Sequence, residues 1–353
     1  MSPLYTHRFL FIGLLFALTA AALGSMLSGS VDIELGEALD ILAHSVSPGE
    51  SLNFSDDMQV KQAVLMQIRL PRVMLAVITG LTLAVSGTVM QGMFRNPLAD
   101  PGLMGISAGC AFGAALFAVL GANWLATMGG VSSVWALPVA AFLGGLLSTW
   151  LVFFLGRSGQ RTDVATMLLA GIAINVIATA GTSALKFVAD DQALRGVVFW
   201  LMGNLGSTPW DRLLWVAPVQ LASVVAMFFY APTLNAFLLG EAEAQHLGYN
   251  VERSKRILIL LVALSVGLSV SLAGVIGFVG LVVPHLLRRL VGADHRVLLP
   301  ASALLGAVLV LLADWLSRTL LAPTEIPVGI LMALTGGPFF IWLLLTTRYR
   351  FIR

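Results

Sequence analysis

Long apolar runs recur along the whole of this sequence, and they constrain its fold more than any other feature. An apolar run of about 18 or more residues is the length that a helix needs to cross roughly 30 Å of hydrocarbon. Hydrophobic residues make up 58% of the 353 positions and charged residues only 11%, whereas a soluble domain has about 25% charged residues. The bilayer is therefore the solvent, and we expect an all-α integral membrane protein.

About ten membrane-spanning helices are predicted from the apolar runs and the residues that interrupt them. The stretch Ile257–Leu287 is too long for one straight span, so we expect a hairpin that turns near Ala273–Gly277. The first run, Phe9–Leu27, exceeds the roughly 7–15 residues of a signal-peptide core, and we expect it to be retained. The predicted helices of this single transmembrane domain (1–353) cover residues 9–29, 70–91, 102–121, 133–155, 164–187, 211–231, 256–273, 277–291, 298–320 and 327–347.

The basic residues favour a topology with both termini in the cytoplasm. Cytoplasmic loops of membrane proteins carry an excess of lysine and arginine, and this topology places thirteen of the twenty basic residues on that side. The opposite side receives the loop 30–62, which is acidic. The thirteen are Arg8, Arg95, Arg157, Arg161, Arg253, Lys255, Arg256, Arg288, Arg289, Arg296, Arg348, Arg350 and Arg353.

Three arginines depart from this pattern, because the topology assigns Arg69, Arg72 and Arg318 to the external edge. They could extend to lipid headgroups, as long basic side chains do, or form a docking site for an acidic partner. Asp314 lies four residues before Arg318 in a predicted span, and this spacing puts both on one helix face. We expect a structural ion pair there, since a single carboxylate that is already paired with an arginine is poorly suited to bind the ion of an ion-coupled transporter.

The residues that several enzyme classes require are missing. The lysines stand at positions 61, 186 and 255, outside any Gly-x-x-x-x-Gly-Lys-Ser/Thr sequence, so the chain has no P-loop for ATP. No Gly-x-Ser-x-Gly or His-Glu-x-x-His sequence occurs, and no catalytic residue is assigned.

The single cysteine, Cys110, excludes an intrachain disulfide and a cysteine metal cluster, and no metal site is predicted. The net charge of +2 is too small to indicate nucleic acid binding.

Two polar segments on the cytoplasmic side are too patterned to be ordinary connectors. The first is residues 95–102, in which Pro97 and Pro101 interrupt the neighbouring helices. A simple tight turn with no further role is the alternative interpretation of this segment. Residues 234–248 are amphipathic, too short to span the membrane, and end at Gly248, which suits a helix C-terminus. A helix in the lipid interface is usually rich in lysine and arginine on its polar face, and this one has none. We therefore expect it to bind a soluble partner.

A series of sequence blocks, in a fixed order from about residue 60 to the C-terminus, carries a family resemblance. The blocks are Arg69-Leu-Pro-Arg72, Ser86-Gly-Thr-Val-Met-Gln91, Arg95-Asn-Pro-Leu-Ala-Asp-Pro101, Leu239-Gly-Glu-Ala-Glu-Ala-Gln-His-Leu-Gly248, Gly277-Phe-Val-Gly-Leu-Val-Val-Pro-His285, Asp294-His-Arg-Val-Leu-Leu-Pro300, Ala313-Asp314, Glu325-Ile-Pro-Val-Gly329 and Gly336-Gly-Pro-Phe-Phe340. In these blocks the sequence resembles the iron-chelate uptake permeases of the FecCD type, which include vitamin B12, ferric-siderophore and bacterial haem permeases.

The resemblance implies a type II ABC importer permease that works as a homodimer in the inner membrane of a bacterium. Its partners would be two cytoplasmic ATPase subunits, which bind the ATP and Mg²⁺, and a periplasmic substrate-binding protein. This chain would hold no permanent cofactor, and transport would proceed by alternating access. The cargo would be haem, which a general likeness around Phe199–Gly203 favours slightly, or another iron chelate such as a ferric siderophore, or cobalamin. An ion-coupled secondary transporter is the alternative from a different class.

The resemblance also implies roles for particular residues. Arg69, Arg72 and Arg318 match periplasmic arginines that pair with glutamates on the two lobes of the binding protein. Residues 236–248 match the cytoplasmic coupling helix, which sits in a cleft of the ATPase. The residues implied for coupling are Leu239, Gly240, Glu241, Ala244, Leu247 and Gly248, and those implied for the inner gate are Asn96 and Leu98.

Overall fold

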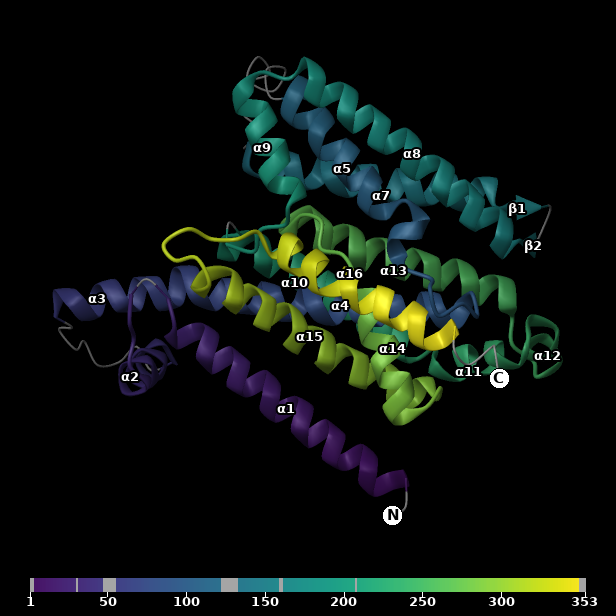
Figure 1. Ribbon diagram of the computed structural model, residues 1–353, viewed down its shortest axis with the longest axis horizontal. Coiled ribbons are helices and arrows are strands. Elements are labelled where there is room, and N and C mark those ends of the chain that lie inside the picture. Colours follow the sequence, from purple (N-terminus) through teal and green to yellow (C-terminus); the bar gives the residue numbers. More distant parts are fainter. Residues whose placement is uncertain are drawn as a thin grey trace.

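The protein is almost entirely helical. The structure, a computed structural model, describes residues 3–29, 31–46, 55–121, 133–158, 161–206 and 208–348. Its α-helices (Figure 1) are α1 (Pro3–Leu27), α2 (Leu35–Val46), α3 (Asp56–Ala63), α4 (Leu70–Met93), α5 (Ile106–Leu116), α7 (Ser133–Leu155), α8 (Val164–Val188), α9 (Asp191–Leu201), α10 (Trp210–Phe228), α11 (Ala231–Leu239), α12 (Glu241–His246), α13 (Val251–Ala273), α14 (Val279–Val291), α15 (His295–Thr319) and α16 (Val328–Arg348).

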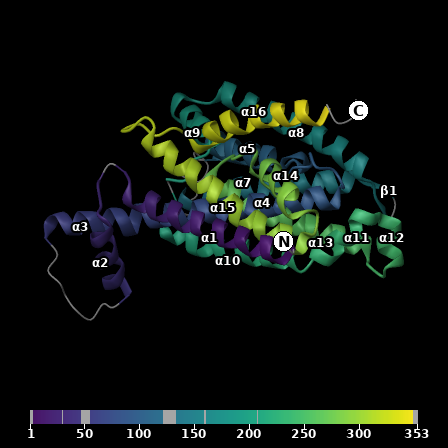
Figure 2. The ribbon, with the colours of Figure 1, turned by 60° about the horizontal axis from the view of Figure 1, so that its bottom comes forward.

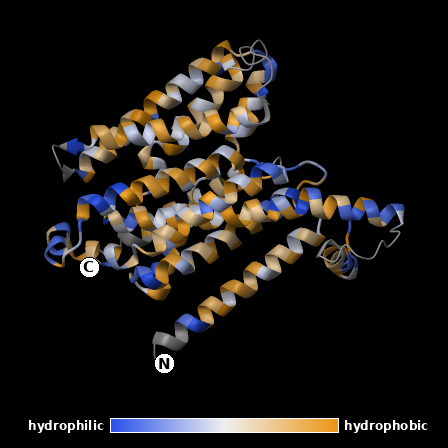
Figure 3. Cartoon of the chain, turned by 180° about the vertical axis from the view of Figure 1, so that it is seen from behind, coloured by the Kyte–Doolittle hydropathy of each residue, from blue (hydrophilic) through white to orange (hydrophobic). Residues whose placement is uncertain are grey.

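All ten predicted spans fall on helices, which confirms the all-α membrane fold. Within the described residues, seven helices are long and apolar enough to cross a bilayer, and the apolar stretches Ile106–Gly121 and Val328–Trp342 are shorter. Helix α14 has only 13 residues, a length of roughly 20 Å against about 30 Å of hydrocarbon. Hydrophobic residues line the middle of the helices and hydrophilic residues gather at two opposite ends (Figure 3), as a surrounding bilayer requires.

The predicted break between the seventh and eighth spans is confirmed. Helix α13 ends at Ala273, and Gly274 follows with a φ of 70°, before α14 begins at Val279. A side chain at Gly274 would also collide, because a Cβ there would lie 2.2 Å from the carbonyl oxygen of Trp200. Glycine is thus required at this turn by both conformation and space.

The second span begins earlier than the sequence predicts. Its helix runs without interruption for 38 residues, from Asp56 to Met93, and Ser55 caps the start by accepting a hydrogen bond from the Met58 N–H. The predicted start at residue 70 stands next to Pro71, which has no N–H to donate. The structure accommodates this proline with a π-helical segment, residues 64–69, immediately before α4, so the helix continues instead of ending.

The short helices α2, α3 and α9 were not predicted. The acidic loop 30–62 contains α2 and α3, and α9 stands between α8 and α10. Asp190 caps α9 by accepting a hydrogen bond from the Ala193 N–H at 2.7 Å. Two short antiparallel strands, β1 (Arg157–Ser158) and β2 (Arg161–Thr162), connect α7 to α8.

Helix α4 forms the centre of the protein, packed against α10, α13, α14 and α15. Its contacts with α15 and α14 are backbone to backbone. A Cβ on Gly80 would lie 2.2 Å from the Gly306 carbonyl oxygen, and one on Gly87 would lie 2.1 Å from that of Gly280. Small residues allow membrane helices to approach this closely. Helices α5, α7 and α8 form a second group, which joins the first mainly where α7 packs on α13 (Figures 1 and 2).

Candidate functional sites at the two ends of the helices

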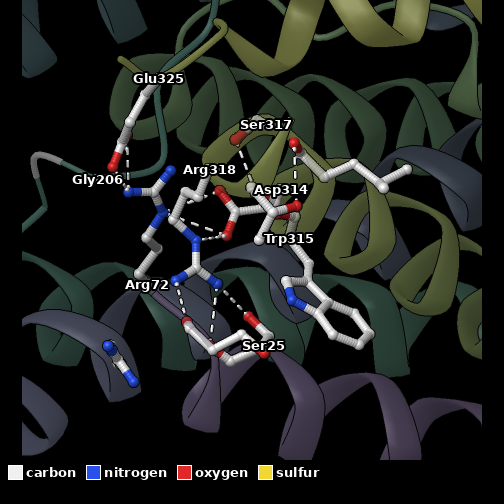
Figure 4. Close-up of polar contacts among 12 residues, drawn as sticks. Ser25, Arg72, Gly206, Asp314, Trp315, Ser317, Arg318 and Glu325 are labelled. Atoms are coloured by element: carbon white, nitrogen blue, oxygen red, sulfur yellow. Dashed lines mark hydrogen bonds and ion pairs between the residues drawn. The ribbon is translucent and has the colours of Figure 1, made fainter. Parts of the chain in front are cut away.

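Arg72, in the first turn of α4, holds two carboxylates at one end of the helices (Figure 4). Its Nε donates to the two oxygens of Asp314 at 2.9 and 3.2 Å, and its Nη1 donates to the two oxygens of Glu325 at 3.0 and 2.9 Å. Asp314 is fully buried in α15, whereas the Glu325 side chain in the loop before α16 is 50% exposed. One guanidinium therefore fastens α4 to α15 and to the loop that follows it.

Arg318 completes this cluster and confirms the predicted ion pair within α15. Its Nε lies 3.5 Å from Asp314 Oδ2. Its Nη2 donates to the carbonyl oxygen and hydroxyl of Ser25 at 3.0 and 2.6 Å, and its Nη1 donates to the Ser28 carbonyl at 3.3 Å. Ser25 lies in the last turn of α1, so Arg318 ties α1 to α15.

Arg69 satisfies carbonyl groups at the same end of α1. It donates from Nη1 to the carbonyl oxygens of Met26 and Leu27, at 2.7 and 2.9 Å, and from Nη2 to that of Val31. The last carbonyls of a helix have no partner within the helix, and a basic side chain stabilises them. The buried Arg69 is thus a C-terminal cap that is supplied by another helix.

The three arginines predicted to dock a partner do come together. They line a pocket of about 160 Å³ with Glu325 and residues including Gly29 and Pro323. Arg69 and Arg72 are buried, the Arg318 side chain is 8% exposed, and all three have partners inside the chain, whereas the Glu325 side chain is half-exposed. Three arginines against Asp314 and Glu325 leave one formal positive charge in the cluster. The docking role of these arginines stays a prediction.

The predicted coupling segment lies at the other end of the protein (Figure 1). It is divided into α11 and α12 by Gly240, whose φ of 133° and ψ of 156° only glycine adopts readily. Leu239 and Leu247 are 65% and 60% exposed, whereas Ala244 is fully buried. The two leucines therefore give this end an apolar surface, and Ala244 attaches α12 to the body of the protein.

Further predicted coupling residues have structural partners. Glu241 pairs with the buried Lys255 of α13 at 2.7 Å, a contact that the sequence did not indicate. Gly248 has a φ of 89° and follows α12, as expected for the residue that closes a helix.

The proposed gate residues lie in the turn after α4. The Asn96 Oδ1 accepts a hydrogen bond from the Leu98 N–H at 2.9 Å, which is a local turn contact typical of asparagine. Leu98 is 42% exposed. The structure thus describes a turn with an exposed apolar tip, and a gating role stays a prediction.

Asn235 of α11 is a connection that the sequence analysis missed. Its Nδ2 donates to Asp294 Oδ1 at 2.7 Å, and its Oδ1 accepts from the backbone N–H of His295 at 2.9 Å. These bonds join α11 to the start of α15. In the sequence, only the family block that begins at Asp294 marks this region, and it does not indicate that Asn235 contacts it.

Comparison with known proteins defines the class first. The fold matches that of a metal-chelate type ABC transporter solved in an inward-facing conformation, with a TM-score of 0.81, 33% identity, and coverage of 96% of this chain and 99% of the other. The hemin transport system permease protein HmuU of Yersinia pestis is 48% identical over 80% of this chain and 83% of its own. This chain is therefore a multi-pass permease of the ABC importer class.

The chain belongs to the FecCD transport family, which matches residues 14–346. Vitamin B12 permeases match as well: the vitamin B12 import system permease protein BtuC of Klebsiella pneumoniae is 38% identical over 86% of this chain and 88% of its own. None of these relatives supports the alternative of an ion-coupled secondary transporter.

Proposed function

We propose that two copies of this chain form the pathway of a bacterial inner-membrane importer that carries haem or another iron chelate into the cytoplasm. Both termini lie in the cytoplasm. Two separate ATPase subunits bind and hydrolyse ATP with Mg²⁺, and a periplasmic binding protein delivers the cargo. The chain itself performs no covalent chemistry.

The apolar surface formed by Leu239 and Leu247 carries this proposal. Two mostly exposed leucines that flank the short polar helix α12, at the opposite end from the arginine pocket, suit insertion into a cleft of a soluble partner. The surrounding Glu243 and Gln245 are exposed as well, which is typical of the polar rim of an interface. The ATPase is the partner that this chain requires, because its sequence has no P-loop.

The arginine pocket supports docking of the binding protein at the other end. Arg72 is held by the half-exposed Glu325, so a glutamate of a partner could take the place of Glu325 without uncovering a buried charge. The surplus positive charge of the cluster favours an acidic surface. In this proposal the cargo enters between the two copies, and movement of the α11–α12 end opens the turn at Asn96 and Leu98.

Haem is the proposed cargo because the hemin permease of Yersinia pestis is 48% identical and the vitamin B12 permease is 38% identical. The test is reconstitution of the chain in proteoliposomes with its ATPase and binding protein, followed by uptake of haem, a ferric siderophore and cobalamin. We expect ATP-dependent, vanadate-sensitive uptake of haem. Uptake of cobalamin or a siderophore alone would reassign the cargo, and no stimulation of ATP hydrolysis by any cargo would refute an importer.

A further inference from the structure

A buried lysine lies where three separate segments meet, next to the α11–α12 end. Lys255, in the first turns of α13, is 1% exposed. Its Nζ lies 2.7 Å from Glu241 Oε1 of α12, 3.9 Å from Glu252 Oε1 of α13, and 3.3 Å from the carbonyl oxygen of Thr162 in β2, to which it donates. The three possible donors of the ammonium group thus face three different parts of the chain.

The burial of Lys255 makes these contacts hard to replace. A buried ammonium group is strongly unfavourable unless it is paired and hydrogen-bonded. The loss of one partner of a buried pair leaves an uncompensated charge. If α12 moved away from α13 alone, Lys255 would lose its nearest carboxylate. The pair with Glu241 therefore resists any displacement of α12 that does not carry α13 with it.

The hairpin between α7 and α8 is attached at the same point. Glu252 accepts hydrogen bonds from the N–H of Thr162 at 3.1 Å and from its hydroxyl at 2.7 Å. The next residue, Asp163, caps α8. Hydrogen bonds from the side chain and backbone of Thr166, and the nearby charge of Lys255, hold the pKa of Asp163 below its ordinary value. Thr162 thus connects the cluster directly to the first turn of α8.

The link between α11 and α12 leaves α12 dependent on this cluster. Gly240 has the backbone conformation described above, and Ala244 is the buried contact of α12. Helix α12 has six residues, too few to be stable as a separate helix. Its orientation is therefore set by the Gly240 turn on one side and by Lys255 on the other.

We infer that Lys255, with Glu241 and Glu252, is a positioning cluster that passes the movement of α12 to the β1–β2 hairpin and so to α7 and α8. The inference rests on the proposed function of α12 as the element that the ATPase moves. The cluster makes α7 and α8 follow α12 as one body with α13, so ATP hydrolysis moves the second helix group as well as the first.

The experiment compares Glu241→Gln and Lys255→Met with the control Asp191→Asn. Asp191 is an exposed carboxylate in the first turn of α9, outside the α11–α12 end and the arginine pocket. In proteoliposomes that contain the ATPase and binding protein, we measure cargo transported per ATP hydrolysed. We expect both variants to bind the ATPase within twofold of wild type but to transport at least fivefold less cargo per ATP, with the control unchanged. Wild-type transport per ATP in both variants would overturn the inference.

A second measurement needs no ATPase and separates this inference from the proposed function. Spin labels replace the exposed side chains of Arg157 in β1 and Gln245 in α12, in the permease in lipid nanodiscs. We expect one narrow distance distribution for the wild type and for Asp191→Asn, and a clearly broader one for Glu241→Gln. An unchanged distribution would overturn the cluster as a mechanical link. Failure of the wild-type chain to bind the ATPase would instead refute the proposed function of α12. The Glu241 side chain is 36% exposed, against 1% for Lys255, so Glu241→Gln remains informative if Lys255→Met does not fold.

Discussion

Removal of the two exposed leucines tests whether the α11–α12 end binds the ATPase. Burial of a leucine side chain contributes about 1.5–3 kcal/mol. Leu239 and Leu247 are 65% and 60% exposed, so docking can bury about two thirds of each, which gives roughly 2–4 kcal/mol for both. Alanine keeps the Cβ atom, and we therefore take the lower end, about 2 kcal/mol or roughly 30-fold in Kd.

The assay is the affinity of detergent-solubilised permease for the purified ATPase subunit, measured by biolayer interferometry for wild type and for Leu239→Ala with Leu247→Ala. The matched control is Leu169→Ala with Leu214→Ala. These leucines are 68% and 62% exposed but lie on the membrane-spanning helices α8 and α10. We expect the control to bind as wild type does. An unchanged Kd for the first double variant, or an equal loss in the control, would refute the assignment of this surface.

Three further predictions concern the arginine pocket and the helix contacts. Asp314→Asn should lower the Tm in detergent, because the two arginines that face it lose a buried counter-charge worth about 3–5 kcal/mol; an unchanged Tm would contradict this. Gly80→Ala should destabilise the protein by about 1–3 kcal/mol through overpacking against α15, while Gly13→Ala, with no atom within 4 Å of the new Cβ, should not. Glu325→Gln should tighten binding of the binding protein by roughly two- to fivefold at low salt, since it removes the half-exposed carboxylate that pairs with Arg72 Nη1. The control Asp191→Asn removes the same charge elsewhere, and equal tightening there would count against the pocket.

The membrane helices could be predicted from the sequence because lipid imposes one rule on every span, which must be apolar over the thickness of the hydrocarbon. Apolar runs therefore located ten helices, of which seven in the described part of the chain are long and apolar enough to span. The turn expected near Ala273–Gly277 in the long run from Ile257 is present, since α13 ends at Ala273. The same rule does not apply outside the bilayer. Helix α3, with Asp56, Asp57 and Lys61, is polar and was assigned to a loop, and the start of the following span was consequently placed too late.

The two polar ends were found from the sequence, but their contacts were not. The out-of-place arginines and the amphipathic segment were visible as departures from topology and composition. Glu325 was visible only as part of a block, and its partner Arg72 lies 253 residues away. Such a pair depends on how α4, α15 and the following loop pack, which no local pattern encodes. Lys255 was counted only as a cytoplasmic charge for the same reason.

The continuous helix from Asp56 to Met93 also has a mechanical consequence. Its 38 residues correspond to a rod of about 57 Å, nearly twice the hydrocarbon thickness of about 30 Å. A rotation of about 5° around its Met93 end would displace Asp56 by about 5 Å over that length. The central helix of the protein is therefore a lever, in which a small tilt beside the turn at Asn96 and Leu98 becomes a large displacement at the far end, where α3 extends beyond the other helices (Figure 2).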